Sequence, residues 1–166
     1  MKTVVSLALV ALCAWVSTAS AQERSAGFPN VIGALKAAPG CLGVETGQTS
    51  SGRQVIFAWF EGKKALVDWY HSDVHQRAMK TVFPDTTFNR EPLPDLPEDT
   101  GTILAIVSVK FGDAAADRPR AISSIGIELY GPLPGGVAVG GRFSPEAVKV
   151  RGLREIAIGA ATQPTR

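Results

Sequence analysis

Apolar and polar residues follow one another along the chain in a pattern that predicts two pairs of strands and one long helix. The segment 102–111 is apolar on both faces at its start, which is typical of a central strand. The pattern predicts a short helix over 29–38, strands over 41–46 and 54–60, a helix over 63–83, and strands over 102–111 and 121–130. This order indicates an α+β fold with a mostly antiparallel sheet and helices on one face.

The segment 63–83 has two unlike faces if it forms one continuous helix. At about 100° per residue, an apolar stripe about 140° wide is formed by Leu66, Trp69, Tyr70 and Val74. A second group falls within about 80° on another side and consists of Asp68, His71, His75 and Met79. We expect the first face to be buried and the second to face a polar surface or a cavity.

The last third of the chain is rich in turn residues. The segment 137–139 is compatible with a short strand, and Ser144-Pro145-Glu146 has the form of an N-cap followed by proline at the first helical position. We expect a single domain over 22–150 and a C-terminal tail over 151–166, frayed from residue 162 onward.

Residues 1–21 have the features of a secretory signal peptide. Lys2 gives the segment a positive start, and its apolar centre spans residues 4–16. The small-residue cleavage pattern is Ala19-Ser20-Ala21. The apolar run spans about 13 residues, whereas a transmembrane helix needs about 20. We therefore expect a protein exported to the periplasm or secreted, with no stable membrane anchor after cleavage; a retained anchor is the alternative.

Charge and cysteine content narrow the classes of partner. Lysine and arginine total 17 against 15 aspartate and glutamate, a formal charge of +2, which gives no electrostatic basis for nucleic-acid binding. Removal of the signal peptide would also remove Cys13 and leave Cys41 alone, so no intrachain disulfide is expected. We interpret Cys41 as a small buried apolar residue at the start of a strand.

Three short motifs within 39–79 resemble the antibiotic-biosynthesis-monooxygenase superfamily of dimeric α+β barrels. They are Pro39-Gly40-Cys41-Leu42-Gly43, Ala58-Trp59-Phe60-Glu61, and Lys64-Ala65-Leu66 followed by Trp69. The resemblance implies a ferredoxin-like antiparallel sheet with helices on one face, and a homodimer that pairs sheet to sheet.

The chain departs from the haem-degrading members of that superfamily in two ways. Met79 stands where those members carry the axial histidine, although His75, one turn earlier, would serve if the haem were shifted. The family's first strand is also missing, because only a helix is predicted before Cys41. Strand 121–130 would supply it in permuted order, a hypothesis that fails if that strand lies at the edge of the sheet.

Two of the functional hypotheses use this scaffold, and the first places its site in a pocket between the long helix and the sheet. The first is a monooxygenase-type enzyme, cofactor-independent or haem-linked, that acts on or binds a haem-like or small lipophilic or aromatic molecule. Trp69 would wall this pocket and Met79 or His75 would contact the cofactor, while the candidate general bases are His75, His71 and Asp68. The second is a non-catalytic binding or structural module on the same scaffold.

A third hypothesis is a surface zinc or copper site. His71 and His75 stand four residues apart, which on one continuous helix brings two side chains within about 6 Å. Asp68 would be a third ligand, and Met79 a soft fourth that favours copper. The competing interpretation is a solvated helix face that happens to carry both histidines.

Overall fold

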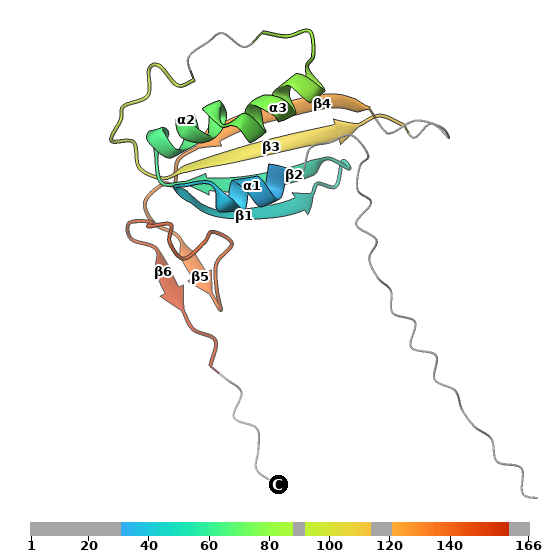
Figure 1. The fold of residues 1–166 in the computed structure, drawn as a ribbon. Helices are drawn as coiled ribbons and strands as arrows, with labels where there is room; N and C mark the ends of the chain where they lie inside the picture. The colour runs from blue at the N-terminus through green and yellow to red at the C-terminus, as the bar shows by residue number, and fades with distance from the viewer. Residues whose placement is uncertain (1–30, 88–91, 114–120, 160–166) are drawn as a thin grey trace, which may run out of the picture.

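An antiparallel four-stranded sheet with helices packed on one face forms the main body of the protein (Figure 1). The computed structural model describes residues 31–87, 92–113 and 121–159. Its elements are α1 (Val31–Ala37), β1 (Cys41–Gln48), β2 (Gln54–Phe60), α2 (Lys63–His71), α3 (Asp73–Val82), β3 (Ile103–Phe111), β4 (Ile122–Tyr130), β5 (Val137–Val139) and β6 (Arg154–Ile156). The α+β class and the four main strands predicted from the sequence are confirmed.

Two of the sequence predictions lie outside the described residues, namely the signal peptide over 1–21 and the frayed end from residue 162. Within the described ranges, no helix has both the length and the apolar character needed to cross a membrane.

The strands follow one another across the sheet in the order β1-β2-β3-β4. Ala105 of β3 lies between Ala58 of β2 and Leu129 of β4, so β3 takes the inner position and β4 the edge. The hypothesis that 121–130 fills an inner position in permuted order is therefore wrong. The physical reason is burial: β3 contributes the buried side chains of Ile103, Ala105 and Val109, whereas no side chain of β4 is fully buried.

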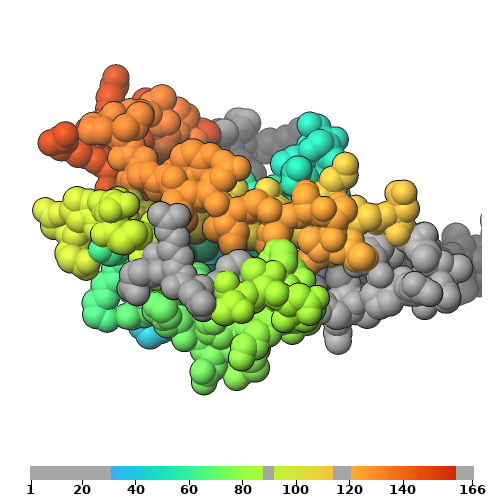
Figure 2. Space-filling model, turned by 90° about the horizontal axis from the view of Figure 1, so that it is seen from above, coloured from blue at the N-terminus to red at the C-terminus, as the bar shows by residue number. Residues whose placement is uncertain are grey.

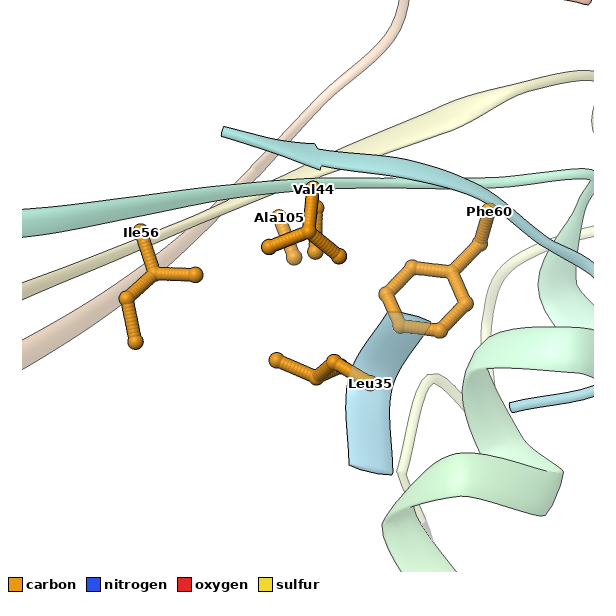
Figure 3. Close-up of a cluster of buried hydrophobic side chains, with 6 residues drawn as sticks. Leu35, Val44, Ile56, Phe60 and Ala105 are labelled. Atoms are coloured by element: carbon orange, nitrogen blue, oxygen red, sulfur yellow. The ribbon is translucent and has the colours of Figure 1, made fainter. Parts of the chain in front are cut away.

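The principal core lies between the sheet and the helices (Figure 3). Alternate residues of β2 point to this face, and Phe60 is the most deeply buried of them, with 1% of its surface exposed. In Figure 3 the side chain of Leu35, from α1, lies beneath Phe60 and Val44 and closes the cluster. Burial of Leu35 explains why so short a helix keeps its place on the sheet.

The opposite face of the sheet is partly covered by the C-terminal segment. The Phe143 ring packs edge-on against Phe57 and Trp59, with ring centroids 5.0 and 5.3 Å apart. Pro145 lies so close to Gly43 that a Cβ there would collide with its ring, so glycine is required at this position. In the view from above (Figure 2), the green helical segment and the red end of the C-terminal part lie on opposite sides of the orange band that includes β4.

The long helix predicted over 63–83 is two helices, and the prediction of one continuous helix is wrong. Ser72 adopts an extended conformation, with φ −62° and ψ 146°, between α2 and α3. Its side chain accepts a hydrogen bond from the backbone N–H of His75 at 3.3 Å and so caps α3. Asp73 then places a negative charge in the first turn, where the helix dipole favours it.

The C-terminal segment is organised by Arg142 and not by a helix. The Arg142 guanidinium donates to the carbonyl oxygens of Val148 and Glu146, at 3.0 and 2.6 Å, and its Nε lies 3.4 Å from Glu155. The N-cap pattern at Ser144 leads only to a turn, in which Val148 N–H bonds the Pro145 carbonyl. β6, which pairs in parallel with β5, lies in the range that the sequence assigned to a tail.

We expect Phe60→Ala to lower the free energy of unfolding by about 3–5 kcal/mol, because it removes a large ring from the centre of the core and leaves a cavity. Urea denaturation followed by circular dichroism measures this loss. Leu133→Ala is the matched control: Leu133 is 82% exposed, so its truncation should change stability by less than about 0.5 kcal/mol. Equal losses for the two variants would contradict the assignment of the core.

A candidate apolar cavity

A cavity of about 270 Å³ lies between the helices and the sheet. Its floor is formed by β2 and β3 through Ile56, Ala58, Phe60, Ala105 and Val107, and its roof includes Leu66, Trp69, Ala78 and Met79. At the sheet edge, Ile125, Ile127 and Leu129 of β4 complete the wall. Tyr70 and His75 are the only side chains in this lining, within the described residues, that can ionise.

The break at Ser72 determines which side chains reach the cavity. Because α3 starts anew at Asp73, its residues are out of phase with those of α2, and the faces drawn for one continuous helix do not apply. His75 and Met79 consequently line the cavity together with Trp69. Asp68 and His71 are exposed and take no part in the lining. The structure thus unites three of the five candidate residues and separates the other two from them.

His75 is oriented by the backbone of the preceding helix. Its Nδ1 lies 2.9 Å from the Tyr70 carbonyl oxygen, which can only accept, so Nδ1 carries the proton. In an unbroken helix this carbonyl would bind the N–H of Val74; the break frees it for His75 and for Gln76, whose amide donates at 2.6 Å. Nε2 of His75 has no hydrogen-bond partner among the described residues, and it is not sealed from solvent.

Two aromatic rings lie beside the imidazole of His75 and contribute to its burial. The centroid of Trp69 lies 5.8 Å from that of His75 in an edge-on arrangement, and that of Tyr70 lies 5.2 Å away. Burial lowers the pKa of His75 below 6.5; the hydrogen bond to Tyr70 opposes this change and the nearby charge of His71 adds to it. His75 is therefore neutral at pH 7, and its Nε2 is available as a hydrogen-bond acceptor or base.

The geometry expected for a metal site is not formed. His71 and His75 belong to different helices, so the expectation that one continuous helix carries both of them is wrong. Asp68 is engaged with Lys64 at 2.6 Å, and the His71 ring packs edge-on against Tyr70. Across the part of the chain that the structure describes, no three His, Cys, Asp or Glu side chains gather as metal ligands would.

Sequence reasoning missed three residues that build this site. Ser72 ends one helix and caps the next, Gln76 shares the Tyr70 carbonyl with His75, and Ala78 leaves space in the roof because its side chain is small. A signal for the break was present, since serine followed by aspartate is a favourable helix start. The positions of Gln76 and Ala78 depend on that break and had no signal of their own.

No protein-family model, curated protein or solved structure matches the chain. The relation of residues 39–79 to the antibiotic-biosynthesis-monooxygenase superfamily therefore stays a prediction.

We expect Ser72→Ala to lower the free energy of unfolding by about 1 kcal/mol through loss of the α3 cap. Ser72→Asp, which restores an N-cap acceptor, should recover most of this loss. Thermal or urea unfolding measures both variants. If the two substitutions were equally destabilising, the side chain of Ser72 would not be acting as a cap.

We expect His75 to titrate below pH 6.5 in the folded protein, as followed by NMR of the imidazole protons. The unfolded chain then binds more protons, so the free energy of unfolding is fully retained above pH 6.5 and decreases as the pH falls from 6.5 through the lowered pKa. His71→Ala assigns the resonance by leaving one histidine among the described residues. Titration of His75 above 6.5 would contradict the burial of its ring.

Proposed function

We propose that the protein binds a small, largely apolar molecule in the cavity between its helices and its sheet. The observation that carries this proposal is an apolar lining in which one neutral imidazole has a free acceptor nitrogen. Binding sites for small molecules are typically apolar hollows with a few polar groups that fix orientation. A cavity of about 150 Å³ holds benzene. The 270 Å³ found here accommodates a flat molecule of about two rings.

The reaction we propose for this molecule is of the monooxygenase type, and it rests on the resemblance of residues 39–79 to that superfamily. His75 is the general base in this proposal, because its Nε2 is free and its neutral form predominates at pH 7. Trp69 provides an aromatic wall beside the bound molecule. His71 and Asp68 are not part of the proposed machinery, since both are exposed outside the cavity.

Haem fits this cavity less well than a smaller molecule does. His75 and Met79 both line the cavity and are of the types that ligate haem iron. The four-ring macrocycle, however, exceeds the space of 270 Å³ that the side chains leave. Haem therefore has no part in the proposed reaction.

A non-catalytic binding module is the second candidate. It is favoured by the single imidazole: without a second acid or base among the described cavity residues other than Tyr70, the site is better equipped to hold a molecule than to transform it. Both candidate functions use the same cavity. They differ in whether the bound molecule is consumed, which would happen only in an enzyme.

Export and a homodimer complete the proposal. A barrel-type dimer would join the sheet faces opposite the helices. At the Trp59 end that face is already packed against Phe143, so a second copy would contact chiefly the neighbouring strand β3, where Leu104 and Ile106 are half-buried. The interface of such a dimer would be smaller at the Trp59 end than an interface between two uncovered sheets.

We expect Ala78→Phe to abolish binding of a two-ring aromatic probe such as naphthalene, because the new ring occupies the space of the ligand. Titration followed by tryptophan fluorescence measures the affinity of wild type and variant. Stability should be retained or increased, since the added ring fills existing space instead of a packed core.

Ala37→Phe is the matched control for this experiment. Ala37 is exposed on α1 outside the lining, so the same substitution there should leave probe affinity unchanged. If naphthalene failed to bind the wild-type protein, or bound Ala78→Phe equally well, the proposed site would be wrong.

A further inference from the structure

We propose that His75 makes the cavity selective for neutral aromatic molecules that carry a hydrogen-bond donor, above all a hydroxyl group. This inference rests on the proposed function, because it concerns which molecules the same cavity accepts. It assigns to His75 a role in specificity that does not depend on catalysis.

The tautomer of His75 is fixed by its contact with the backbone. A carbonyl oxygen has no hydrogen to give, so the 2.9 Å contact with Tyr70 requires the proton on Nδ1 of His75. The same carbonyl is held by the Gln76 amide at 2.6 Å, which keeps it in place at the end of α2. In the neutral ring Nε2 is then an acceptor only, and a ligand must donate to it.

An acceptor left without a partner in a filled cavity weakens binding. Nε2 has no partner among the described residues, so in the free protein it is satisfied by solvent. A ligand that displaces solvent without donating leaves a buried unsatisfied acceptor, which weakens binding, whereas a donor restores the bond. An apolar molecule and a hydroxylated one of the same shape are therefore not equivalent in this cavity.

A hydroxyl group suits the site because it can both donate and accept a hydrogen bond. The indole of Trp69 also lines the cavity, with its ring centroid 5.8 Å from that of His75, and its N–H can only donate. This N–H has no hydrogen-bond partner among the described residues. A hydroxyl group donates to His75 and accepts from a donor such as Trp69, whereas an ether or ketone offers nothing to His75.

The test compares naphthol, its methyl ether and naphthalene in calorimetric titrations of the protein, well above pH 6.5 so that His75 is neutral. We expect naphthol to bind about three- to tenfold more tightly than the methyl ether, the effect of one net hydrogen bond. The direction of the difference in affinity is diagnostic. The ether carries an extra methyl group, so a purely apolar cavity would bind the ether more tightly than naphthol.

Three variants test whether the preference comes from His75. His75→Phe should remove it, whereas His71→Phe, at the exposed neighbouring histidine outside the lining, should keep it. His75→Gln retains a side chain that can donate to Tyr70 and accept from the ligand, and should restore part of the preference. This third variant also covers the case in which His75→Phe does not fold.

The outcomes separate the two proposals. If naphthalene and naphthol both bind, but the ether binds with the same affinity as naphthol, the proposed selectivity is wrong and the cavity proposal stands. A preference that persists in both His75→Phe and His75→Gln at its full size, or that disappears in His71→Phe, also overturns the role of His75. If none of the three molecules binds, both proposals are wrong.

Discussion

The Tyr70 carbonyl oxygen is the group on which the arrangement of the cavity depends. Because the chain turns to an extended conformation at Ser72, this oxygen loses its helical partner and is bound instead by the side chains of His75 and Gln76. A helix end must find partners for its last carbonyls, and here the partners come from the next helix. One backbone group thereby joins α2 to α3 and fixes the tautomer of the imidazole.

The strands could be predicted because their signal is local. β3 is apolar along most of its length and β2 carries aromatic and β-branched residues, so both are evident without knowledge of their neighbours. The order of the strands in the sheet was not evident from the sequence, since it depends on which strand buries more apolar surface when the sheet packs. β3 takes the inner position through Ile103 and Ala105, while β4 stays at the edge with Ile127 exposed.

The cavity could be predicted only in part. Trp69, His75 and Met79 were identified as residues of a pocket between helix and sheet, and the structure brings them together. The choice of their neighbours failed because a helical wheel assumes a constant rotation per residue, and one extended residue at Ser72 invalidates it for all of α3. The C-terminal segment was less accessible still, because Arg142 holds it through backbone carbonyls, which leave no trace in residue type.

The position of β4 at the sheet edge has a kinetic consequence. Ile127 is 52% exposed and Leu129 is 38% exposed, yet both belong to the cavity wall. A molecule bound as proposed would pass beside these two side chains by their rotation, without separation of Leu35 from Phe60 in the core. Such rotations take nanoseconds or less, far less than the opening of packed helices. Under the proposed function, the residence time in the cavity would be governed by the contacts made inside it, and the core would stay rigid while the bound molecule exchanges.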